Sequence, residues 1–153
     1  MRRIDALLDE YGASHQNKTN KTVHWVCVPL IVWSLTALLW SVPVPGLLAA
    51  AGLNWMLAIF ALSLIYYLFL SVPLAIGFLV FGMLCIAANL RLDMLETPLW
   101  QLALVVFALA WIGQFWGHMI EGKKPSFFKD VQFLLIGPAW LLSFLYTRLG
   151  VRF

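Results

Sequence analysis

The chain has 153 residues, of which 63% are hydrophobic and 11% are charged, whereas a soluble domain carries about 25% charged residues. A chain this short buries only about two-thirds of its unfolded surface, so its eight tryptophans and eleven phenylalanines exclude a water-soluble globule. The formal charge of +3 includes no basic run longer than a pair, which excludes nucleic-acid binding. We therefore expect an all-α integral membrane protein.

Residues 1–22 are polar and contain no apolar core of a signal peptide. Their few apolar side chains recur at helical spacing: Ile4, Leu7, Leu8 and Tyr11. This pattern predicts an amphipathic, interfacial helix over residues 1–22 that lies on the membrane surface.

Five apolar stretches follow, and about 20 apolar residues suffice for a helix to cross a bilayer. They lie at about residues 23–42, 54–70, 74–90, 99–119 and 131–149. We expect a single transmembrane domain over residues 1–153, built as a bundle of four to five transmembrane helices. The fifth stretch contains Gly137 and Pro138, and it either spans the bilayer or kinks and re-enters it.

The basic residues predict the orientation, because Lys and Arg are enriched in cytoplasmic loops. With five spans and a cytosolic N-terminus, seven basic residues lie inside and three outside. The inner set is Arg2, Arg3, Lys18, Lys21, Lys123, Lys124 and Lys129, and the outer set is Arg91, Arg148 and Arg152. We expect a multi-pass protein, in the inner membrane if the chain is bacterial, with its N-terminus in the cytosol.

The three histidines of the chain all fall on the cytosolic face of this topology. His24 opens the first span, His118 closes the fourth, and His15 lies in the preceding polar segment. His15 and His24 are nine residues apart, about 180° around a straight helix, so they reach one centre only if the chain bends between them.

Polar residues accompany two of these histidines on one helical face. Asn17 and Asn20 precede His24 at helical spacing, and Gln114 and Glu121 flank His118 in the same way. Imidazoles and a carboxylate are the ligands of non-haem Fe(II) sites. Two alternatives to an iron site stay open. In one, these side chains are ordinary interfacial polar residues and Glu121 pairs with a loop lysine. In the other, two histidines hold a haem.

Two histidine-bearing segments resemble the 2-hydroxy fatty acid dioxygenase family. The first is YGASHQNKTNKTVHWVCVP at residues 11–29, and the second is WIGQFWGHMIEGKKPSF at residues 111–127. Gly137 and Pro138 are similar to the family's last apolar segment, so the resemblance covers nearly the whole chain. The Pro-Ser-Phe after Glu121 departs from the family's usual ending, which leaves the role of Glu121 open.

The resemblance implies an Fe(II)-dependent dioxygenase that uses O2 to shorten a 2-hydroxy fatty acid by one carbon among membrane lipids. His15, His24 and His118 would bind the metal, and Glu121 would be the catalytic carboxylate candidate. Asn17, Asn20 and Gln114 would orient the imidazoles. Two other functions stay open: a non-enzymatic membrane protein, such as a transporter or assembly factor, or a haem-binding electron carrier. Transport is less favoured, because the second and third spans offer few polar residues.

Overall fold

The computed structural model describes residues 2–124 and 132–153, and these residues form seven helices without a strand. The helices are α1 (Arg3–Gly12), α2 (Lys18–Ser41), α3 (Gly46–Ala50), α4 (Trp55–Leu70), α5 (Val72–Leu92), α6 (Leu99–Glu121) and α7 (Phe133–Leu149). By length and composition α2, α5 and α6 can each cross a membrane, while α4 and α7 are shorter apolar helices. The predicted all-α class is confirmed. Lys129 and the Pro-Ser-Phe segment lie outside the described residues.

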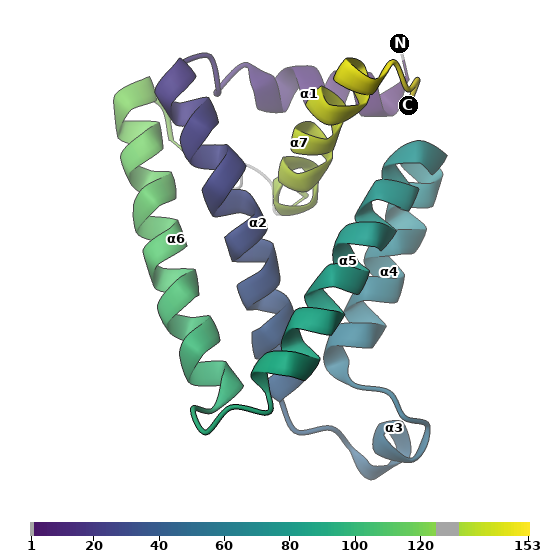
Figure 1. Cartoon of the computed structure of the whole chain (residues 1–153). Helices are drawn as coiled ribbons and strands as arrows, with labels where there is room; N and C mark the ends of the chain where they lie inside the picture. Colours follow the sequence, from purple (N-terminus) through teal and green to yellow (C-terminus); the bar gives the residue numbers. More distant parts are fainter. Residues whose placement is uncertain (1, 125–131) are drawn as a thin grey trace.

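The long helices form two pairs that diverge toward α1 (Figure 1). One pair is α2 with α6 and the other is α4 with α5. The pairs converge at the opposite end of the molecule, where Ala37 of α2 packs in a cluster with Leu92 of α5 and Leu99 of α6. A space therefore lies between the pairs on the α1 side, and α7 lies within it.

Two glycines allow α6 to approach α2 closely. A Cβ atom on Gly113 would lie 2.7 Å from the Cys27 sulfur, and one on Gly117 would lie 2.6 Å from the Asn20 side-chain oxygen. Small residues four apart are a common device for close helix packing in membranes. The contact brings the last turn of α6 beside the first two turns of α2.

The N-terminal region is two helices, which corrects the prediction of one interfacial helix over residues 1–22. The first helix ends at Gly12, residues 13–17 change the chain direction, and α2 begins at Lys18. The Asn17 side chain accepts hydrogen bonds from the backbone amides of Thr19 and Asn20. Asparagine is far more favourable as an N-cap than within a helix, so a new helix begins here.

The last helix extends from the α1 end into the space between the helix pairs and does not reach the opposite end of the molecule (Figure 1). Phe133, its first residue, packs against Tyr11, with ring centroids 6.0 Å apart. Ala139 shares a buried cluster with Ile4, and the carbonyl of Phe153 accepts a hydrogen bond from Arg2. Both ends of α7 therefore contact α1, which favours the returning segment over the spanning one, the two alternatives left open by the sequence.

Candidate metal centre

The three histidines come together at the α1 end of the bundle. His15 is in the bend between α1 and α2, His24 is in the second turn of α2, and His118 is in the last turn of α6. All three are buried, and one ring nitrogen from each lies within 4.8 Å of the others. His15 and His24 can reach one centre because the chain bends between them. The bend turns His15 back toward the face of α2 that carries His24.

Hydrogen bonds fix which nitrogens of His15 and His24 face the centre. The Nδ1 atom of His15 is 2.6 Å from the carbonyl oxygen of Tyr11, and that of His24 is 2.9 Å from the carbonyl oxygen of Asn20. A carbonyl only accepts, so each Nδ1 carries the hydrogen and each Nε2 presents a lone pair. Two lone pairs thus face each other across the 2.9 Å between the Nε2 atoms, which is unfavourable unless a cation joins them.

This arrangement fits a metal ion. Two imidazole nitrogens that each lie about 2.1 Å from one ion are about 3.0 Å apart when their bonds meet at a right angle. The Nδ1 atom of His118 is buried without a hydrogen-bond partner in the described part of the chain, so it is free to bind as well. Three imidazoles on one side of an ion leave positions open for other ligands.

Aromatic rings enclose the cluster and keep it neutral. The ring of Tyr11 stacks on His15 with centroids 4.3 Å apart, and Trp140 of α7 lies 5.2 Å from the same imidazole. Burial lowers the pKa of His15 to about 4, so this ring keeps its lone pair at neutral pH. Trp140 could not be found from the sequence, whereas the position of Tyr11 four residues before His15 was a usable signal.

Glu121 lies beside the cluster and holds the bend. One carboxylate oxygen accepts the backbone amide of Gln16 at 2.8 Å. The other accepts the backbone amide of Asn17 at 2.8 Å and the side-chain amide of Asn20 at 3.1 Å. The end of α6 is thereby fastened to the residues on both sides of the N-terminus of α2. Lys123 donates to the carbonyl of Ala13 at 2.6 Å and fastens the same bend.

The three predicted amide side chains have different surroundings. Asn17 caps α2, and Asn20 connects the carboxylate of Glu121 to the imidazole of His24 through its side chain and its carbonyl. Gln114 is buried, and its side-chain oxygen has no hydrogen-bond partner among the described residues. It lines a cavity next to the histidines.

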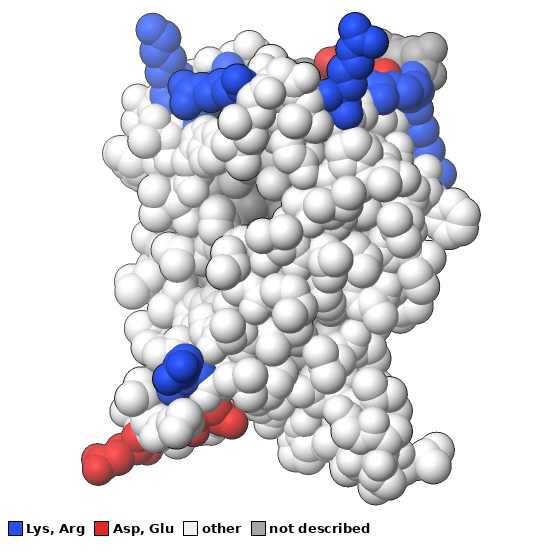
Figure 2. Space-filling view, turned by 45° about the vertical axis from the view of Figure 1, so that its right-hand side comes forward, with Lys and Arg blue, Asp and Glu red and all other residues white. Residues whose placement is uncertain are grey.

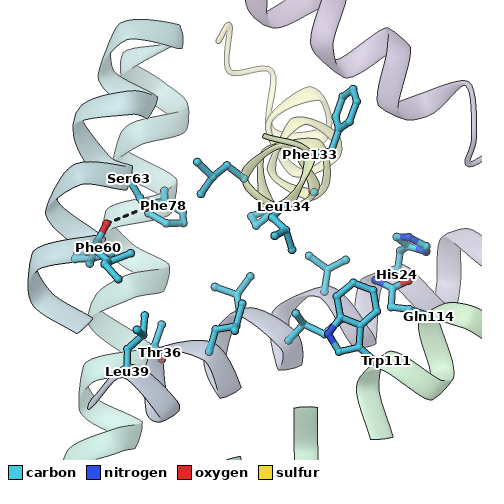
Figure 3. A pocket seen from close by; sticks show the side chains of 18 of the residues that line it. His24, Thr36, Leu39, Phe60, Ser63, Phe78, Trp111, Gln114, Phe133 and Leu134 are labelled. Carbon is cyan, nitrogen blue, oxygen red and sulfur yellow. Dashed lines mark hydrogen bonds between the residues drawn. The ribbon is translucent and has the colours of Figure 1, made fainter. Parts of the chain in front are cut away.

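That cavity is apolar, about 250 Å³ in volume, and lies between the two helix pairs. Figure 3 shows His24 and Gln114 at one end of it and Leu39 and Phe60 toward the other. From His24 to Leu39, α2 rises about 22 Å. The cavity is therefore long and narrow, with its polar groups concentrated at the histidine end.

Fold and site together define a class: an all-helical chain with three helices of membrane-crossing length and a buried histidine cluster that can hold a metal ion. Within that class, the chain belongs to the Mpo1-like family, described as 2-hydroxy-palmitic acid dioxygenase Mpo1-like, which matches residues 1–149. This confirms the resemblance seen in the sequence.

A curated relative has the same description. The chain is similar to the 2-hydroxy-palmitic acid dioxygenase MPO1 of Saccharomyces cerevisiae, with 29% identity over 143 residues, which cover 92% of this chain and 78% of the yeast protein. No solved structure matches the chain.

Proposed function

We propose that the protein is an Fe(II)-dependent dioxygenase that acts on 2-hydroxy fatty acids and shortens them by one carbon. The observation that carries the proposal is the position of the three-histidine cluster at the head of a long apolar cavity. The family and the yeast relative support the same reaction class. A haem carrier is not favoured, because 2.9 Å between two Nε2 atoms leaves no room for a porphyrin between the rings.

His15, His24 and His118 would hold the iron. Bound there, Fe(II) would supply open coordination positions for oxygen and for the head group of the substrate. Backbone carbonyls fix the tautomers of His15 and His24, so that their Nε2 atoms are available to the iron. The rings of Tyr11 and Trp140 cover His15 and exclude water. Glu121 keeps the bend in place, which makes it a positioning residue in this proposal.

The acyl tail would occupy the cavity with the carboxylate at the histidine end. One lipid tail occupies about half of the roughly 30 Å hydrocarbon layer, so a cavity that follows about 22 Å of α2 accommodates a long chain. Each methylene group transferred from water into this apolar space contributes about 0.8 kcal/mol. The tail thus supplies affinity, while the polar end determines where the reaction occurs.

In the membrane, α2, α4, α5 and α6 would cross the bilayer, α1 would lie on its cytosolic surface, and α7 would re-enter from that surface. Figure 2 shows most of the visible Lys and Arg side chains at one end of the molecule, with some acidic ones among them, and a smaller group of acidic and basic side chains at the other end, separated by an uncharged belt. Such a belt matches a bilayer core, and the basic end matches the cytosolic side. The histidine site would then open near the inner surface.

The test is metal analysis of the purified protein, followed by oxygen uptake and product analysis with 2-hydroxypalmitate. We expect bound iron and a product one carbon shorter. His24→Ala and His118→Ala should each lose iron and turnover, whereas Gln101→Ala on the exposed face of α6 should retain both. Unchanged turnover in both histidine variants would contradict the proposal.

A further inference from the structure

The side chain of Gln114 is one of several among the described residues that bury a polar atom without a hydrogen-bond partner, and it lines the cavity beside the histidines. It is 5% exposed, and its Oε1 atom is buried without a hydrogen-bond partner among the described residues. Leaving an amide oxygen in this state costs about 1–3 kcal/mol relative to a paired one. A bound ligand, ion or water that satisfies the group is one of the reasons why a native protein keeps it.

Gln114 differs from the hydroxyl-bearing side chains of the cavity wall. Thr36 and Ser63 also line the cavity, but each donates its hydroxyl to a carbonyl of its own helix, at 2.7 Å and 2.9 Å. These hydroxyls are satisfied by the protein. Gln114 instead has an acceptor oxygen without a partner among the described residues, one helical turn before His118 and next to His24 (Figure 3).

An open acceptor requires a donor, and the proposed substrate has one. At neutral pH the carboxylate of a 2-hydroxy fatty acid only accepts hydrogen bonds, and the hydrocarbon tail neither donates nor accepts them. The 2-hydroxyl group is the only donor, and it is on the carbon next to the carboxylate. With the tail in the cavity, this hydroxyl lies at the histidine end, where Gln114 is.

We propose that Gln114 Oε1 accepts a hydrogen bond from the 2-hydroxyl group and thereby selects 2-hydroxy acids over unsubstituted fatty acids. This inference rests on the proposed function. An unsubstituted acid would leave the amide oxygen unpaired, and sites built to bind a hydroxyl strongly reject analogues that lack it. Membrane fatty acids without a 2-hydroxyl group would thus be excluded although their tails fit equally well.

The experiment compares binding of 2-hydroxypalmitate and palmitate to the full-length, iron-loaded protein, measured without oxygen by the change in tryptophan fluorescence. The variant is Gln114→Met, which keeps the length and flexibility of the side chain and removes the acceptor. Gln114→Leu is a second variant in case the first does not accumulate. The control is Gln101→Met, also on α6 but exposed.

We expect the wild type and the control to bind 2-hydroxypalmitate more tightly than palmitate. In Gln114→Met this preference should fall about tenfold or more, with palmitate bound as well as before and the iron content unchanged. Because the side-chain NH2 group can only donate, its loss would affect both carboxylates alike and leave the ratio unchanged.

Three results would overturn the inference. In the first, folded and iron-loaded Gln114 variants keep the wild-type preference for 2-hydroxypalmitate over palmitate, and the wild type turns over 2-hydroxypalmitate. Gln114 then has no role in selection, and the proposed function still holds. Parallel weakening of both ligands indicates a structural role instead. If the wild type neither binds nor turns over 2-hydroxypalmitate, the proposed function is wrong, and the inference with it.

Discussion

At the scale of single residues, Glu121 has a larger effect than its half-buried position at the end of α6 indicates. The first amides of a helix lack partners within the helix, and a negative charge near this end is stabilising. Glu121 accepts hydrogen bonds from the amides of Asn17, the N-cap of α2, and of Gln16 just before it. His15 is the residue immediately before these amides, so the carboxylate holds in place the backbone next to a histidine that is proposed to bind the metal.

Glu121→Gln tests this positioning role. The substitution replaces one acceptor oxygen by an NH2 group that cannot accept from a backbone amide, so we expect a loss of about 1–3 kcal/mol in unfolding free energy. Iron should also dissociate more readily, because His15 is no longer fixed. Thermal unfolding in detergent and iron content measure the two effects, with exposed Glu96→Gln as the control. Unchanged stability and iron content with lost turnover would instead indicate a carboxylate that takes part in the chemistry.

At the scale of helices, the contact between α2 and α6 determines the geometry of the site. His24 and His118 are on different helices, and their ring centroids are 5.1 Å apart. Gly117, directly before His118, permits this approach because its missing side chain leaves room for Asn20. The packing of α2 against α6 and the geometry of the proposed metal centre therefore both depend on Gly117.

Gly117→Ala and Gly113→Ala form a matched pair one turn apart. Each adds a methyl group to the same contact, and we expect each to cost about 1–3 kcal/mol through overpacking. In Gly113→Ala the methyl meets only the sulfur of Cys27, so iron should be retained. In Gly117→Ala it meets Asn20, which connects Glu121 and His24, so iron affinity should fall. Equal iron affinity in both variants, measured by competition with a chelator, would contradict the coupling.

The sequence predicted those features that depend on local pattern. Apolar stretches and their breaks placed α2, α4, α5 and α6 within a few residues of their observed bounds. His24 and His118 were expected on one face because the ends of spans determine it. The path of α7 depends on packing against α1, which no local pattern encodes, and the contact of Trp140 with His15 follows from that path. The bend before α2 was named only as a condition for His15 and His24 to meet and was not placed, although Asn17 is a recognisable N-cap.

At the scale of the whole molecule, the path of α7 changes the distribution of charge. Nine of the ten Lys and Arg residues lie in the described segments, since Lys129 does not. Because α7 returns to α1, Arg148 and Arg152 join the basic end, which leaves Arg91 alone at the other. Eight basic residues at one end against one at the other is a stronger asymmetry than the seven against three expected from five spans, and it supports the orientation proposed above, with the α1 end on the cytosolic side.

Single-cysteine labelling tests this topology in a background of Cys27→Ala and Cys85→Ala, since both native cysteines are buried. Exposed probes would be Glu10→Cys on α1, Val151→Cys after α7 and Glu96→Cys at the opposite end. In intact cells an impermeant maleimide should label only the probe at 96, and in inverted vesicles it should label those at 10 and 151. The reason is that α7 begins and ends beside α1, with Phe133 against Tyr11 and Phe153 bound to Arg2. Labelling of the probe at 151 from outside would mean that α7 spans the membrane, and the contacts of Trp140 with His15 could not then form.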